Sequence, residues 1–155
     1  MTTTATPELA CTSLPLPGAG GATAAWAASV LAQAGLTAEA LYVATSDGGA
    51  REALSFWAGA RETGLAFANP AAFPWTLANS ATGRISQVLG INGPCTTYVG
   101  GAEAVEAAGQ DAADDVASGL VASALVVALS GEDPILPEGG PVRVRVVARL
   151  VGPRA

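Results

Sequence analysis

Apolar positions recur along the chain with two different periods, which predicts helices and strands in turn. From residue 23 to residue 35 they return every three or four positions, typical of a helix with one buried face. Thr23 is expected to cap the start of this helix and Gly35 its end. Similar patterns predict helices over residues 51–61, about 71–89, with Pro74 in the first turn, and 102–118.

Short apolar runs between these helices predict the strands, at residues 9–16, 41–45, 96–99, 122–129 and 142–146. The run at 122–129 is almost continuously apolar, the pattern of a strand buried on both faces. The run at 142–146 alternates Val with Arg, which indicates a strand with one wet face. Strands separated by helices favour a three-layer α/β domain with a mixed sheet.

The length of the chain is that of one domain, so residues 1–155 are interpreted as a single unit. We find no internal repeat. The polar start, about residues 1–8, is expected to be disordered. The Gly- and Pro-rich segment 131–141 is interpreted as a loop and not as a linker, because little of the chain follows it.

Composition restricts the possible partners. Half of the residues (50%) are apolar and only 13% are charged, so part of the surface is expected to be covered by another protein chain. The net charge is -6 and all seven basic residues are Arg, set singly apart from Arg143 and Arg145. Without a basic patch, nucleic-acid binding is disfavoured.

Neither a metal, a cofactor nor a membrane is expected. Cys11 and Cys95 lack C-x-x-C spacing, and the chain has no His to complete a Cys/His zinc site. The N-terminus has no basic segment followed by an apolar one, and every apolar run falls short of the roughly 20 residues of a membrane span. A cytoplasmic location is expected.

The most specific pattern lies between residues 70 and 101. It consists of Pro70-x-x-Phe73, Asn79-x-x-x-Gly83-x-Ile85-Ser86 and Leu89-Gly90-Ile91-Asn92-Gly93-Pro94. It resembles the N-terminal half of the β-ketoacyl synthases, in which a Pro and a Phe precede an Asn-containing helix that ends in a Gly-Pro turn. The resemblance covers residues 41–129. It implies a truncated, half-thiolase-like α/β domain: three layers around a mixed, mostly parallel five-stranded sheet.

The same resemblance implies that the chain is a pseudoenzyme. Active family members carry their nucleophilic Cys eight residues after the proline of the turn, and counting from Pro94 gives Ala102. A methyl group can neither attack a thioester nor hold an acyl chain. The family also uses a pair of His to stabilise oxyanions, and this chain contains none.

Gly93-Pro94-Cys95 followed by a turn without Cys resembles the chain length factors, the non-catalytic branch of the family. These subunits pair across a dyad with an active ketosynthase and help to bound the channel of the growing chain. The resemblance implies a heterodimer with a catalytic β-ketoacyl synthase in type II polyketide or fatty-acid-like biosynthesis. An acyl carrier protein would deliver the substrates to that partner. Ordinary chain length factors have both halves of the fold, so this chain departs from them in length.

Two sets of residues are candidates for this role. The strand at the dyad gives the interface candidates Thr96, Thr97, Tyr98, Val99 and Gly100, to which we add Trp75. Phe73, Thr76 and Ser80 stand at i, i+3 and i+7 of one expected helix, so they are expected to share a face. The resemblance to the chain length factors implies that this face gates the channel. The alternative places Phe73 in the core and the other two against the partner.

Other interpretations remain open. The chain could be an independent acyl-thioester hydrolase or transferase that uses Cys95 or Glu103, or a purely structural self-dimer. Cys95 is more simply a small buried hydrophobe, and Glu103 a cap in the first turn of a helix. Trp57 and Phe67 are interpreted, like Trp75, as core or interface anchors.

Overall fold

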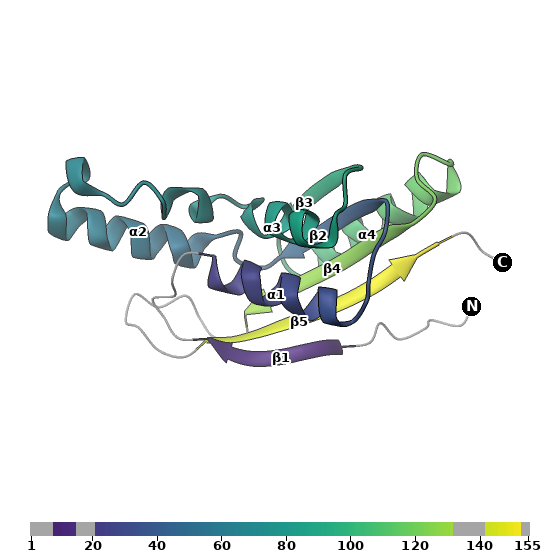
Figure 1. Cartoon of the computed structure of the whole chain (residues 1–155), viewed down its shortest axis with the longest axis horizontal. Helices are drawn as coiled ribbons and strands as arrows, with labels where there is room; N and C mark the ends of the chain where they lie inside the picture. The colour runs from purple at the N-terminus through teal and green to yellow at the C-terminus, as the bar shows by residue number, and fades with distance from the viewer. Residues whose placement is uncertain (1–7, 15–20, 132–141, 153–155) are drawn as a thin grey trace.

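The computed structural model describes residues 8–14, 21–131 and 142–152, which form a mixed α/β arrangement (Figure 1). The body of the sheet comprises β2 (Ala40–Thr45), β3 (Cys95–Val99), β4 (Ala124–Gly131) and β5 (Val142–Val151), and β1 (Glu8–Leu14) extends it along β5. The order is β1-β5-β4-β2-β3. β3 and β4 run parallel to β2, whereas β5 pairs antiparallel with both β4 and β1. The sheet is therefore mixed, as predicted, but it is not mostly parallel, because two of its four strand pairings are antiparallel.

Helices cover both faces of the sheet, which confirms the three layers. On one face lie α1 (Ala22–Gln33) and α3 (Ser80–Leu89), and on the other lies α4 (Ala102–Ala117). The helix α2 (Ala50–Thr63) instead extends to one side of the sheet (Figure 1). Two short 3-10 helices, η1 (Leu65–Phe67) and η2 (Phe73–Thr76), run back along α2. We call residues 50–79 the arm.

The core has two parts because β2 and β4 are buried on both faces. Alternate residues of β2 point to opposite sides: Leu41 and Val43 pack with α1 and α3, whereas Tyr42 packs with α4. All six residues of β2 are buried. Residues 124–127 of β4 are buried as well, as the continuous apolar run predicted. On the α4 side the helix contributes small residues, namely Ala104, Ala108 and Ala112.

The single helix predicted over residues 71–89 is wrong. The η2 turn ends at Thr76, Leu77 has an extended backbone with ψ 140°, and α3 begins only at Ser80. Two hydroxyl groups bind carbonyls that a continuous helix would need: Thr76 donates to the carbonyl of Phe73, and Ser80 donates to that of Pro74. Phe73, Thr76 and Ser80 therefore do not share one helix face.

Smaller differences concern the ends of elements. Thr23 is not a cap: α1 begins after Gly21, which has a left-handed backbone (φ 82°) and makes no side-chain cap. A Cβ atom at Gly21 would lie 2.7 Å from atoms of the Trp75 ring, so the chain needs glycine here. β5 continues to Val151, beyond the predicted 142–146, because its register with β4 extends to Ala124. The expectations for residues 1–7 and 132–141 lie outside the described residues.

We predict that Gly21→Ala destabilises the fold more than Gly35→Ala does. Both residues have positive φ, so each substitution costs about 1–2 kcal/mol of backbone strain. Only at Gly21 does the new methyl group meet a ring, whereas a Cβ atom at Gly35 meets nothing within 4 Å. The Gly21 variant should lose about 1–3 kcal/mol more free energy of unfolding in urea titrations. Equal losses would contradict the close packing of Trp75 on Gly21.

Candidate functional site

β3 forms one edge of the sheet, and among the described strands only β2 pairs with it. The Leu41 N–H donates to the Pro94 carbonyl (2.9 Å), and the Gly100 N–H donates to the Thr45 carbonyl (3.0 Å). Backbone groups of successive residues in a strand point to opposite sides, so the even-numbered positions face β2. The odd-numbered positions have backbone groups that face away from the sheet, namely Cys95, Thr97 and Val99.

This edge lacks the charges that usually protect an open strand. Residues 85–102 contain no Asp, Glu, Lys or Arg. Cys95, Thr96 and Val99 are exposed, while Thr97 and Tyr98 are half-buried. An uncharged edge with free backbone groups is a template for pairing with another strand. The predicted interface residues 96–100 therefore lie together on a surface suited to that role.

β3 is held firmly from both faces of the sheet. On one face the Tyr98 hydroxyl donates to Asp111 of α4 (2.6 Å), and the neighbouring Tyr42 donates to Asp115. On the other face the hydroxyls of Thr82 and Thr97 are hydrogen-bonded at 2.6 Å. The pKa values of both tyrosines are raised, first by burial and then by their Asp partners, so each phenol keeps its donor proton.

Trp75 does not belong to this edge. It is half-buried, and its ring lies over Gly21 at the start of α1. Its packing links η2 to the helix layer. The structure thus packs the ring of this predicted anchor against its own chain. Nothing in the local sequence could indicate this, because the contact joins residues far apart along the chain.

The residue that the resemblance assigns to the nucleophile position lies just beyond β3. Ala102 is exposed and is the first residue of α4. The neighbouring Glu103 accepts a hydrogen bond from the Gly101 N–H (2.9 Å), as the capping interpretation predicts. Hydrogen bonds from the backbone N–H groups of Glu103 and Gly101 lower the pKa of the Glu103 carboxyl. This geometry favours an ionised cap over a general base poised near neutral pH.

Cys95 is at the start of β3, as predicted, but it is exposed and not buried. Desolvation raises the pKa of its thiol, although a hydrogen bond with Ser86 opposes the shift. A reactive thiol needs the opposite shift, toward the thiolate. Within the described residues there is no group of three His, Cys, Asp or Glu side chains that could hold a metal ion. The described helices also include none that is long and apolar enough to cross a membrane.

The channel candidates lie on the arm and at its junction with α3. The side chain of Phe73 is 53% exposed, so the interpretation of Phe73 as a core residue is wrong. Its ring contacts Phe56 of α2 edge to face, with centroids 5.9 Å apart. The hydroxyls of Thr76 and Ser80 turn toward backbone carbonyls of η2. Phe73 is therefore the member of the set with a large free apolar surface.

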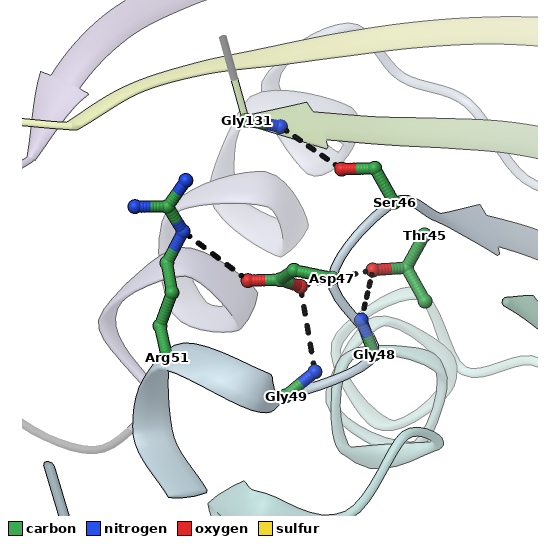
Figure 2. A network of polar contacts seen from close by, with 7 residues as sticks. All are labelled: Thr45, Ser46, Asp47, Gly48, Gly49, Arg51 and Gly131. Atoms are coloured by element: carbon green, nitrogen blue, oxygen red, sulfur yellow. Dashed lines mark hydrogen bonds and ion pairs between the residues drawn. The ribbon is translucent and has the colours of Figure 1, made fainter. Parts of the chain in front are cut away.

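Sequence reasoning missed a polar network that fixes the base of the arm (Figure 2). Asp47 forms an ion pair with Arg51 (3.3 Å) and accepts hydrogen bonds from Thr45 and the Gly49 N–H. The Ser46 hydroxyl accepts a hydrogen bond from the N–H of Gly131 in β4. The turn signal Ser-Asp-Gly-Gly predicted where β2 ends, but not that its carboxylate orients the following helix.

Comparison with solved structures identifies the class of fold: the described chain has the thiolase-like α/β fold of ketosynthase and chain length factor subunits. No family model and no curated protein matches the sequence. One similar structure is that of the ketosynthase ApeO in complex with its chain length factor, ApeC, from Xenorhabdus doucetiae. It shares 15% identity at a TM-score of 0.60, over 83% of this chain and 56% of that one.

A second similar structure is titled as the ishigamide ketosynthase/chain length factor. It shares 18% identity at a TM-score of 0.53, and the match covers 74% of this chain and 37% of that chain. The chain therefore spans little more than half the length of the matched chain in the first structure, and less of the matched chain in the second. At this level of identity the likeness establishes the fold, which agrees with the resemblance of residues 41–129 to the ketosynthase family.

Proposed function

We propose that this chain is a non-catalytic, ketosynthase-like partner subunit that pairs with an active β-ketoacyl synthase. The observation that carries the proposal is the uncharged, open edge of β3, held rigid by Tyr98 and Thr97 in a domain of ketosynthase fold. Both similar structures are of a ketosynthase with a chain length factor, which supports the same kind of partner. The pathway would be type II polyketide or fatty-acid-like biosynthesis in the cytoplasm.

In this proposal β3 pairs antiparallel with the corresponding strand of the ketosynthase across a dyad. A two-fold axis that passes between two edge strands, perpendicular to the sheet, makes them run in opposite directions. The backbone groups of Thr97 that face away from β2 would enter the ladder between subunits. Because β3 is fixed on both faces before the partner arrives, little ordering cost accompanies the pairing.

The ketosynthase would supply all of the chemistry, namely the nucleophilic Cys and the His pair, on substrates delivered by an acyl carrier protein. In this chain Ala102 stands at the nucleophile position and the sequence contains no His. Cys95 has a raised thiol pKa, and Glu103 is engaged at the start of α4. These features favour the subunit role over the hydrolase or transferase alternative.

We predict that the chain alone neither decarboxylates malonyl-carrier protein nor becomes acylated by acyl thioesters. The reason is that residue 102 is Ala, which cannot form a thiolate, and that the chain contains no His to activate a nucleophile. Mass spectrometry of the intact protein after incubation with an acyl-carrier substrate tests this. A stable acyl adduct that disappears in a folded Cys95→Ser variant would overturn the non-catalytic proposal in favour of an enzyme.

We predict next that Thr97→Pro weakens binding of the ketosynthase about tenfold or more, because proline removes an outward-facing backbone donor. The control is Thr97→Val, which also loses the hydroxyl bond to Thr82 but keeps the N–H group. Affinity would be measured after co-expression of the two subunits, by sedimentation of labelled protein. Equal losses in both variants would place the effect in the Thr82 contact, and no loss in a folded proline variant would refute the β3 interface.

We propose further that the chain helps to bound the acyl channel, with Phe73 as the gating side chain. Its half-exposed ring supplies apolar bulk that a growing chain would meet. Phe73→Ala should then lengthen the products of the reconstituted complex, since packed apolar walls yield little to extra methylene groups. Leu120→Ala, which shortens an exposed side chain (64%) just past α4, should leave the length unchanged. If the Phe73 variant gave an unchanged distribution of product lengths at matched amounts of complex, the gating role of Phe73 would be refuted.

A further inference from the structure

Charged residues are almost missing from a long segment of the chain that the structure largely exposes. The sequence carries 7 Lys or Arg and 13 Asp or Glu residues, but residues 63–102 include only Arg84 among them. This segment comprises the second half of the arm, from the end of α2 through η1 and η2, together with α3 and β3. Most of residues 61–79 are nevertheless exposed. Depletion of charge is the compositional mark of the centre of a protein–protein interface.

Large exposed apolar side chains gather on the same arm. Of the eleven in the described residues, six lie between residues 54 and 77: Leu54, Trp57, Leu65, Phe67, Phe73 and Leu77. Phe67 is 80% exposed and Trp57 is 55% exposed. Single exposed apolar residues are ordinary, but a cluster of this kind marks a contact surface. Aromatic residues such as Trp57 are also frequent among the side chains that dominate binding energy.

The arm adds little to the core of its own chain. In α2 the only buried residue is Ala60, and the helix packs mainly on η1 and η2. Its base is fixed to the sheet by the ion pair of Asp47 with Arg51 (Figure 2). Folding of this chain alone therefore gives no reason for Trp57 and Phe67 to be apolar, whereas a partner resting on a firmly based arm does.

The arm surface is continuous with the open edge at β3. A Cβ atom at Gly48 would lie 3.0 Å from Val99 and 3.7 Å from Ala78, so the end of β3 and the end of the arm meet at this glycine. The exposed Leu77 follows next to Ala78. From there Phe73 contacts Phe56, and Phe56 contacts Trp57, each with ring centroids 5.9 Å apart.

We infer that the arm is a second part of the interface with the ketosynthase. In this interface the ketosynthase covers the exposed side chains of Leu77, Phe73, Trp57 and Phe67. This inference rests on the proposed function. A partner strand antiparallel to β3 begins beside Val99, so the partner's preceding segment lies next to Leu77. The ketosynthase surface that fits residues 63–79 of the arm is apolar and uncharged, and charge belongs only opposite Arg61 and Glu62, the exposed charges of α2.

The test compares ketosynthase binding by the full chain and its surface variants. Trp57→Ser and Phe67→Ser should each weaken the affinity about tenfold or more, as expected for apolar anchors. Leu120→Ser is the matched control: Leu120 is 64% exposed but lies just past α4, away from the arm, and its substitution should change affinity by less than about twofold. All three residues are exposed, so thermal melting should show that the variants remain folded.

The outcomes separate the inference from the proposed function. If Trp57→Ser and Phe67→Ser bind as the wild type does while Thr97→Pro does not, the arm is no interface and the subunit role stands. If the wild-type chain binds no ketosynthase, the proposed function fails and the inference fails with it. If the wild type instead forms a homodimer that Trp57→Ser dissociates, the occupant is a second copy of this chain and the inference is overturned.

Discussion

The position of every candidate residue depends on β2, the strand that is buried on both faces and paired on both edges. Leu41 and Val43 fix the layer of α1 and α3, and Tyr42 fixes α4. Its parallel pairing with β3 sets which backbone groups of β3 are used internally and which face outward. Its last residue, Thr45, receives the Gly100 N–H, so the turn before Ala102 is also anchored on this strand.

The turn after β2 determines where the arm goes. Asp47 accepts a hydrogen bond from the Gly49 N–H and forms an ion pair with Arg51 in the first turn of α2, so the helix direction is fixed within six residues of the strand. Gly49 has a left-handed backbone, and a Cβ atom there would lie 3.0 Å from the carbonyl oxygen of Thr76. The start and the end of the arm thus meet at one glycine. Because its two ends meet here, the arm can project from the sheet as an apolar segment that contributes little to the core.

Much of the sheet could be predicted from the sequence because periodicity reports burial directly. The continuous apolar run of β4 and the position of α4 followed from pattern alone, and counting from Pro94 placed Ala102 at the start of a helix. The break between η2 and α3 could not be predicted in this way. It depends on the hydroxyls of Thr76 and Ser80 competing with the backbone for carbonyl groups. The burial of Trp75 depends on a glycine fifty-four positions earlier, which no local pattern reports.

Two surfaces of this chain lack the usual protection against association: the open edge at β3 and the apolar arm. β3 is fixed by the Tyr98–Asp111 and Thr82–Thr97 bonds into an edge ready for pairing, whereas natural edge strands are usually protected by charge, bulges or cover. The arm likewise exposes aromatic rings with no charge from residue 63 to Arg84. The net charge of -6 is carried elsewhere, notably by the acidic residues of α4, and cannot shield these surfaces. Both unprotected surfaces meet at Val99 and Gly48, so one protein subunit placed against that junction would cover both at once.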